Sequence, residues 1–220
     1  MVPLIVAAML SCASHESHAS HALSTTLTPA VLPLAIDVVT TSTLPVSSTI
    51  VSDALEEAAS IWSTVGIAVQ WRRVDPSIAR DSPSLIVIVD DEIGASRDDG
   101  VSLGWITFAR GLPERTIHLS RSNGARLLAT VNKYSSLPTR AQETLVGRAL
   151  GRALAHEIGH YLLQTPAHSP VGLMRARRSV DDFFSTTRIG MDLTPEQRGF
   201  VAHRWLGGLS SDSTGVNGAS

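Results

Sequence analysis

The sequence is poor in cysteine and in charge. Cys12 is the only cysteine among 220 residues, so no disulfide can form within the chain. Charged side chains make up 17% of the residues and the formal net charge is −2, which gives no electrostatic basis for binding nucleic acid or an anionic membrane. Hydrophobic residues reach 43%, enough for a packed core, and no internal repeat is visible. We therefore expect one domain with tails, or at most two small domains, and a monomer.

The apolar run at the start of the chain is short. Residues 1–10 (MVPLIVAAML) are too few to span a bilayer, and they resemble the apolar core of a secretion signal. Met-Leu-Ser-Cys at 9–12 is similar to a bacterial lipoprotein box with a lipid anchor at Cys12, and cleavage around 19–22 is the alternative. We expect a signal peptide or lipoprotein leader over 1–22 and an exported protein, which is secreted, periplasmic or lipid-anchored at the cell envelope.

The remaining chain has the pattern of one α/β or α+β domain over 31–206, between a linker over 23–30 and a disordered Gly/Ser-rich tail over 207–220. Apolar periodicity predicts five strands and three helices. The strands are 34–40, 67–74, 85–89, 103–108 and 115–120, and the helices are 52–65, 139–163 and 194–205. The first helix can cross over between two parallel strands, so we expect a mixed, mostly parallel twisted sheet of about five strands.

The most informative motif lies near the end of the long helix, where residues 156–160 are His-Glu-Ile-Gly-His. On a helix His156 and His160 lie about 40° apart around the axis, so one face carries both imidazoles. Two imidazoles on one face can hold a zinc ion, and Glu157 can reach a water molecule there without being a ligand. The flanking residues are mostly apolar, and polar side chains in such a helix need partners. The motif predicts a metal site with Glu157 as general base.

A catalytic zinc site needs a third protein ligand and an open position. His168 is the first candidate, because it lies eight residues after His160 and just past the helix break that Pro166 imposes. Glu196 is the alternative, since other zinc peptidases use a downstream glutamate. However, Glu196 lies in the first turn of a predicted helix, where an acidic residue is already favourable.

Five residues match the metzincin family of zinc peptidases in kind and order: His156, Glu157, His160, His168 and Met174. Metzincins carry His-Glu-x-x-His-x-x-Gly-x-x-His followed by a methionine-containing turn, and this chain has HEIGHYLLQTPAHSPVGLM. The resemblance covers about 31–206, although only 156–174 are specific. It implies a zincin-like (metzincin) fold, one catalytic Zn²⁺ ion, and a Met174 that packs beneath the metal without binding it.

The chain departs from the family pattern between the second and third histidines. The family's glycine falls at Leu163 and its third histidine at Pro166, so this chain has two extra residues. Leu163 cannot adopt the positive φ that glycine allows without a cost. We therefore expect the helix to run on slightly and the chain to turn at 164–166.

The resemblance also implies where substrate binds. The strand over 103–108 is similar to the metzincin edge strand, where an extended peptide pairs with free backbone groups, which would bring Gly104, Trp105 and Ile106 to the substrate. A purely structural strand is the alternative. Arg175 follows Met174, together with Arg177 and Arg178, in the segment that helps wall the S1′ pocket of metzincins. A solvated basic loop is favoured there.

These features predict a zinc-dependent endopeptidase that acts on a peptide or protein substrate. In this hypothesis His156, His160 and His168 hold the metal, and Glu157 is the general base. Two alternatives stay open. The chain could be a non-catalytic zinc-binding domain of the same fold that binds peptides or partners, or a zinc hydrolase of a non-peptide amide.

Overall fold

A computed structural model describes residues 31–41, 47–91 and 102–206 of the chain. The predicted leader with Cys12, the linker, the tail and most of the loop expected over 90–100 lie outside these ranges. Among the described residues, no helix combines the length and apolar character needed to cross a bilayer.

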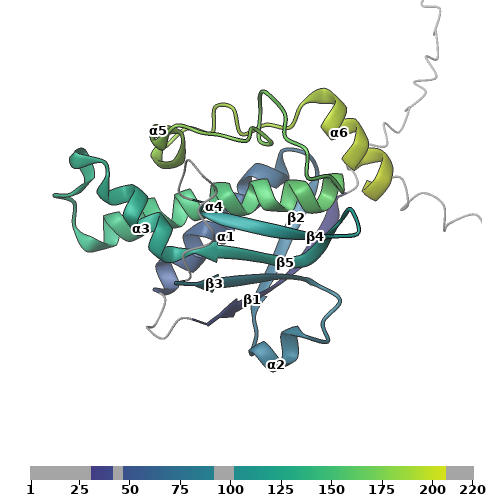
Figure 1. Cartoon of the computed structure of the whole chain (residues 1–220), viewed down its shortest axis with the longest axis horizontal. Helices are drawn as coiled ribbons and strands as arrows, with labels where there is room; N and C mark the ends of the chain where they lie inside the picture. Colours follow the sequence, from purple (N-terminus) through teal and green to yellow (C-terminus); the bar gives the residue numbers. More distant parts are fainter. Residues whose placement is uncertain (1–30, 42–46, 92–101, 207–220) are drawn as a thin grey trace, which may run out of the picture.

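Five strands form one sheet, in the order β2-β1-β3-β5-β4. Their bounds are β1 Leu32–Thr40, β2 Ile67–Arg73, β3 Leu85–Asp90, β4 Gly104–Ala109 and β5 Leu112–Ser120. The first four in the spatial order run parallel, and β4 pairs antiparallel with β5 at one edge (Figure 1). The mixed, mostly parallel sheet and the edge position of the fourth strand are therefore confirmed.

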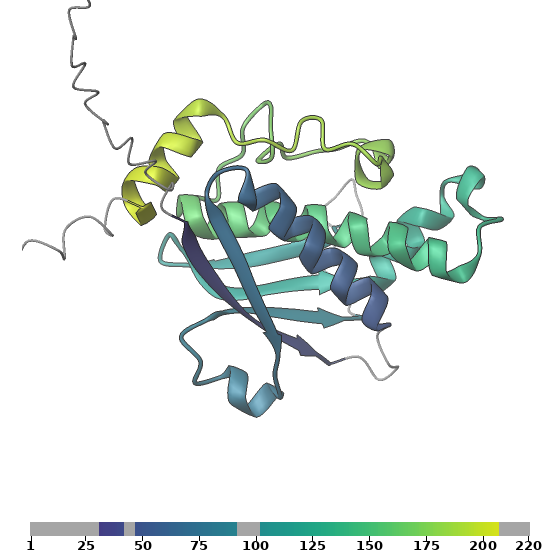
Figure 2. The same cartoon turned by 180° about the vertical axis from the view of Figure 1, so that it is seen from behind.

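Two long helices lie side by side on the same face of this sheet (Figures 1 and 2). Helix α1 (Ser48–Ser63) connects the parallel neighbours β1 and β2, which confirms the predicted crossover. Helix α4 (Thr139–Leu163) has the predicted bounds and carries the His-Glu-Ile-Gly-His motif near its C-terminal end. The shorter helical elements are α2 Pro76–Ala79, α3 Arg121–Ala129, η1 Asn132–Tyr134, α5 Val180–Phe184, α6 Pro195–Val201 and the π-helical turn η2 Ala202–Leu206.

The start of helix α6 follows a local sequence signal, whereas the start of helix α1 is set by packing. Thr194 and Gln197 form the predicted capping box at the start of α6, with Pro195 as its first residue. Helix α1 instead begins at Ser48, so the prediction that it starts near residue 52 was wrong. Its first turn is buried and packs into the core, and this burial outweighs the weak helix propensity of β-branched residues there.

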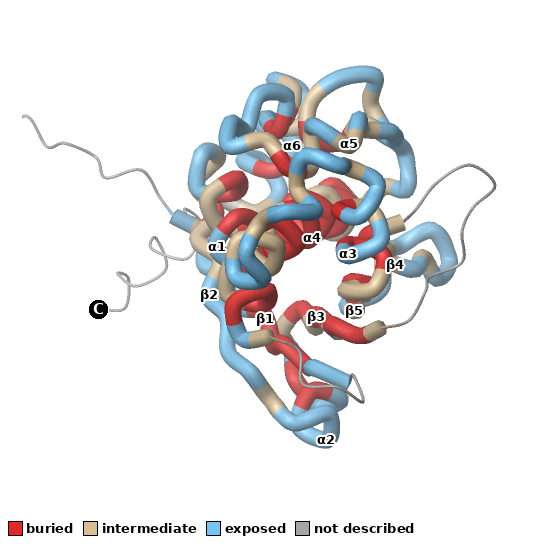
Figure 3. The backbone as a smooth tube through the Cα atoms, turned by 90° about the vertical axis from the view of Figure 1, so that its left-hand side faces the viewer, coloured by how far each residue is buried: buried red, intermediate tan, exposed pale blue. Residues whose placement is uncertain are grey.

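Helix α4 is buried on most of its circumference (Figure 3). One side packs on the sheet, and another side meets α1 through small residues four positions apart: Gly147, Gly151, Ala155 and Gly159. A Cβ atom on Gly151 would lie 2.5 Å from the carbonyl oxygen of Ala54 in α1. The buried Trp62 of α1 donates its indole N–H to the carbonyl of Ala155 over 3.1 Å. The close approach of α1 thus fixes the position of the motif-bearing helix.

The close contact predicts a large difference between two glycine-to-alanine substitutions. Gly151→Ala should lower the free energy of unfolding by about 1–3 kcal/mol, because the methyl group would collide with α1 backbone. Gly199→Ala in α6 meets no atom within 4 Å and should be neutral or stabilising by up to about 1 kcal/mol. Urea unfolding of both variants checks this; equal stabilities would contradict the proposed packing.

Candidate metal centre

The side chains of His156 and His160 leave α4 on one face, and the backbone holds each of them through a ring nitrogen. His156 Nδ1 lies 2.9 Å from the carbonyl oxygen of Leu173, and His160 Nδ1 lies 2.7 Å from that of Thr165. A carbonyl oxygen only accepts hydrogen bonds, so these contacts assign the proton of each neutral ring to Nδ1. Each Nε2 atom is therefore left with a lone pair, as a metal ligand requires.

The two Nε2 atoms face each other at 3.1 Å. Burial lowers the pKa of His156 to about 4 and also lowers the pKa of His160, so both rings are neutral near pH 7. Two facing lone pairs repel each other and form no hydrogen bond, but a cation placed between them would remove the repulsion. Nitrogen ligands at about 2.0–2.1 Å from a tetrahedral zinc ion lie about 3.3–3.4 Å apart, close to the observed separation. The separation of the two Nε2 atoms therefore suits a shared metal ion.

The chain brings His168 to the same place. A possible ligand atom from each of His156, His160 and His168 lies within 4.8 Å of the other two. The His168 ring centroid is 5.2 Å from that of His156 and 4.9 Å from that of His160. Unlike the other two, His168 is exposed. The three histidines converge as the sequence predicted, and the ligand role of His168 remains a prediction.

Glu196, the alternative ligand, does not join this group in the described part of the chain. Its carboxylate is fully exposed in the first turn of α6. Hydrogen bonds from its own backbone and from Thr194 lower its pKa. An acidic side chain is favourable at the N-terminal end of a helix, so the presence of Glu196 there needs no metal ion to explain it.

Gln164 makes the turn that leads from α4 to His168. The helix ends at Leu163, and Gln164 has φ 54° and ψ 38°, which is the left-handed conformation. The predicted turn at 164–166 is therefore confirmed, and the positive φ that the family pattern assigns to glycine falls one residue later, on Gln164. The next residue, Thr165, supplies the carbonyl group that holds His160. The turn thus sets both the path to His168 and the orientation of His160.

Met174 lies beneath the motif and is fully buried. A Cβ atom on Gly159 would collide with its sulfur atom, so the methionine packs directly against the backbone of the His-Glu-Ile-Gly-His segment. Its turn begins at Gly172 (φ +77°), and the carbonyl of Met174 accepts a hydrogen bond from the backbone of Ser169 at 2.9 Å. Met174 thus packs tightly against the backbone of the helix segment that carries His156 and His160.

Glu157 points away from solvent, with 9% of its surface exposed. Burial raises the pKa of its carboxyl group to about 8, and a hydrogen bond with the backbone of Ile106 in β4 opposes this shift. The carboxyl group therefore lies between the metal-site helix and the edge strand. Such a group can accept and return a proton at near-neutral pH.

The predicted substrate residues lie on β4, whose outer edge has no partner strand among the described residues. Ile106 lies beside Glu157, as described above. Trp105 stacks on His118 of β5, with ring centroids 5.0 Å apart and an interplanar angle of 2°. Gly104 is packed tightly, since a Cβ atom there would lie 2.9 Å from Leu119. Phe108, which sequence reasoning missed, presents its ring edge-on to His160 at 6.0 Å between centroids.

The arginines after Met174 form the favoured solvated basic loop only in part, since Arg177 is exposed but Arg175 and Arg178 are partly buried. Arg175 pairs with Asp182 at 2.5 Å, so its guanidinium group already has an anionic partner. Arg178 donates to three backbone carbonyl groups and is half-buried. The prediction of a solvated loop was wrong for Arg178, because its side chain satisfies carbonyl groups that a turn-rich segment leaves without partners.

Comparison with known protein families gives no match, and no curated protein is significantly similar in sequence. Solved structures that are similar in fold include the following two. Archaemetzincin from Methanopyrus kandleri has 15% sequence identity and a TM-score of 0.47, over 77% of this chain and 94% of that chain. A zinc-dependent peptidase from Methanocorpusculum labreanum has 14% identity and a TM-score of 0.48, over 76% of this chain and 99% of that chain.

Removing the third histidine tests the ligand set. His168→Ala should weaken zinc binding by more than about 100-fold, because loss of a direct ligand should exceed the 10–100-fold effect of losing an outer-shell partner. Glu196→Gln should bind zinc as the wild type does. Competition with a chromophoric chelator measures both. Undiminished affinity in His168→Ala, or a loss in Glu196→Gln instead, would reject His168 as the ligand.

The turn at Gln164 can be tested with a matched pair of substitutions. Gln164→Val should lower the free energy of unfolding by about 1–2 kcal/mol and weaken zinc binding, because a β-branched residue resists positive φ. Gln164→Gly should retain zinc affinity, because glycine adopts this conformation freely. Thermal unfolding and zinc titration of the two variants provide the measurement. Valine tolerated as well as glycine would show that the turn does not control the site.

Proposed function

We propose that the protein is a zinc-dependent endopeptidase. The observation that carries this proposal is the convergence of three imidazoles, two of which face each other with unprotonated Nε2 atoms. Zinc accepts nitrogen ligands, and three protein ligands with one open position are typical of catalytic sites, whereas structural sites are closed by four. Among the described residues, no fourth His, Cys, Asp or Glu belongs to the group.

A zinc ion held by His156, His160 and His168 would act as a Lewis acid that polarises a substrate carbonyl group and lowers the pKa of water. Glu157 performs the proton transfers. Its carboxylate takes a proton from the attacking water as the oxygen adds to the carbonyl carbon. It then gives this proton to the amide nitrogen as the carbon–nitrogen bond breaks. Glu157 is not one of the converging residues, so its carboxyl group is not needed as a ligand.

The edge strand β4 supports a peptide as the substrate. Its outer side offers backbone N–H and C=O groups, and an extended peptide can add to such an edge as a further strand. Ile106 on this strand contacts Glu157, so a peptide bound along β4 would pass the general base. In this proposal Gly104, Trp105 and Ile106 supply the strand that a peptide lies against. Arg175 is the weaker substrate contact, because it already pairs with Asp182.

Replacing the general base separates metal binding from catalysis. Glu157→Gln should keep zinc bound and lower peptidase activity by about 10²–10⁴-fold, because the amide cannot take the proton. Glu143→Gln, 14 residues earlier on the same helix, should keep both. Zinc content and cleavage of a mixed peptide library, followed by mass spectrometry, provide the readouts.

Three outcomes of this experiment are distinct. Undiminished cleavage by Glu157→Gln would contradict the mechanism. A zinc-loaded wild type that cleaves no peptide would favour the non-catalytic binding domain. An activity on non-peptide amides that Glu157→Gln abolishes would favour the third hypothesis.

A further inference from the structure

One backbone carbonyl group links the metal centre to the segment that follows it. The carbonyl oxygen of Leu173 accepts a hydrogen bond from His156 at 2.9 Å and a second one from Nη2 of Arg178 at 3.0 Å. A carbonyl oxygen has two lone pairs, so both donors can be satisfied together. The orientation of the His156 ring therefore depends on an oxygen atom that Arg178 also holds.

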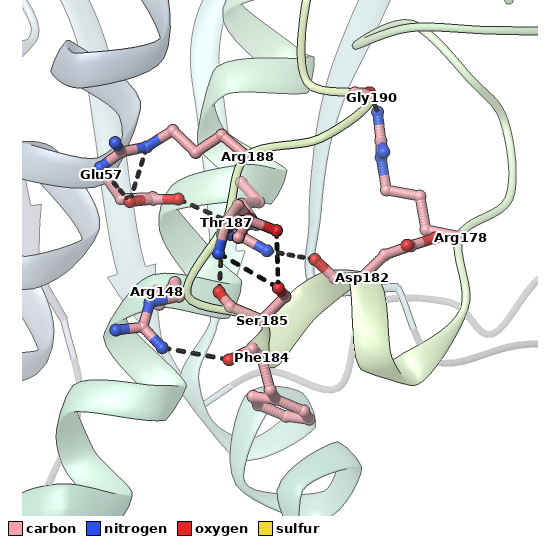
Figure 4. A network of polar contacts seen from close by, with 10 residues as sticks. Glu57, Arg148, Arg178, Asp182, Phe184, Ser185, Thr187, Arg188 and Gly190 are labelled. Carbon is pink, nitrogen blue, oxygen red and sulfur yellow. Dashed lines mark hydrogen bonds and ion pairs between the residues drawn. The ribbon is translucent and has the colours of Figure 1, made fainter.

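The same Arg178 nitrogen joins two turns of backbone. It lies 2.6 Å from the carbonyl oxygen of Gly172 and 3.1 Å from that of Gly190, so its two N–H groups are shared among these two acceptors and the carbonyl of Leu173. Both glycines have positive φ, +77° and +73°, and Figure 4 shows Arg178 extended toward Gly190. Arg178 thus ties the turn that contains Met174 to a second turn 18 residues further along the chain.

Other arginines fasten the middle of this segment to the helices. Arg152 donates to the carbonyl groups of Ser185 and Thr187, both at 2.8 Å, and it pairs with Glu57 of α1 at 2.9 Å. Arg148 donates to the carbonyl of Phe184 at 3.0 Å (Figure 4). None of these bonds reaches a carbonyl group that holds a histidine of the site. Within the described residues, these contacts anchor the segment, whereas the Arg178 contact reaches the metal centre.

We propose that Arg178 is a positioning residue for the metal site. It holds the Leu173 carbonyl in place, so that His156 keeps its proton on Nδ1 and directs Nε2 toward the point it shares with His160. Outer-shell groups that fix the ring and tautomer of a metal-binding histidine typically change metal affinity by about 10–100-fold. This inference rests on the proposed function to the extent that the group is a zinc site.

Charge and geometry predict opposite effects of removing Arg178. A guanidinium cation near a zinc ion repels it, so if charge dominated, removal would tighten zinc binding. If positioning dominates, removal frees the Leu173 carbonyl and zinc binding weakens. Lysine keeps the charge and carries three N–H donors on one nitrogen, enough for the three contacts of Nη2, but its side chain is one bond shorter, so it reaches the three carbonyl groups less well. We therefore expect zinc affinity to fall about 10–100-fold in Arg178→Met and by a smaller factor in Arg178→Lys.

The test compares wild type, Arg178→Met, Arg178→Lys and the control Arg148→Met. The control removes an arginine–carbonyl bond from the same segment without touching a carbonyl group at the site. Zinc affinity is measured by chelator competition, and circular dichroism shows that each variant is folded. ¹⁵N chemical shifts of the His156 ring in the metal-free protein report its tautomer. We expect Nδ1–H in wild type and Arg148→Met, and mixed tautomers in Arg178→Met. If Arg178→Met does not fold, Arg178→Lys provides both readouts.

The proposal is overturned if Arg178→Met and Arg178→Lys bind zinc as well as or better than wild type with an unchanged tautomer. It is also overturned if Arg148→Met loses as much affinity, because the effect would then be general loosening of the segment. If the wild type binds zinc but cleaves no peptide, the proposed activity is contradicted and the role of Arg178 is unaffected. If the wild type binds no zinc, the proposed function fails and the tautomer measurement alone decides the role of Arg178.

Discussion

Burial of helix α4 is the constraint on which the rest of the structure depends. A polar group taken out of water is costly unless it finds a partner, and this helix carries Arg152, His156, Glu157 and His160 into the interior. Arg152 is satisfied by Glu57 and by backbone carbonyl groups. The histidines are satisfied at one ring nitrogen each, and their other nitrogens face each other. A metal ion bound between these nitrogens would remove that remaining repulsion.

The helix alone does not make the site. It supplies two imidazoles and a carboxyl group, but the carbonyl groups that orient the imidazoles come from Thr165 and Leu173, in the connections that follow. Those connections are themselves held by the left-handed Gln164 and by Arg178. The close contact between α1 and α4, which Gly151 permits, sets the depth at which the helix lies. The geometry of the centre is therefore a property of the whole layer packed on the sheet.

Sequence reasoning succeeded where a local signal exists. The spacing of His156 and His160 and the capping box at Thr194 are local patterns, and the structure has the helices where these patterns predict them. Sequence reasoning failed where tertiary contacts decide. Helix α3 (Arg121–Ala129) was not predicted, because its Ser, Asn and Gly residues are weak helix formers, although Ser120 caps it. Carbonyl partners such as that of Leu173 cannot be recognised from the sequence, since every residue has a carbonyl group. A charged Arg152 one turn before His156, in an apolar stretch, was a signal that could have revealed the anchored segment.

The central claim is that three imidazole nitrogens bind one zinc ion. X-ray absorption spectroscopy at the zinc edge of the loaded protein tests this most directly, because it reports the number and type of ligands. The account predicts three imidazole nitrogens at about 2.0–2.1 Å and one oxygen ligand that is not a carboxylate. Two imidazoles with a carboxylate, or four imidazoles, would contradict it.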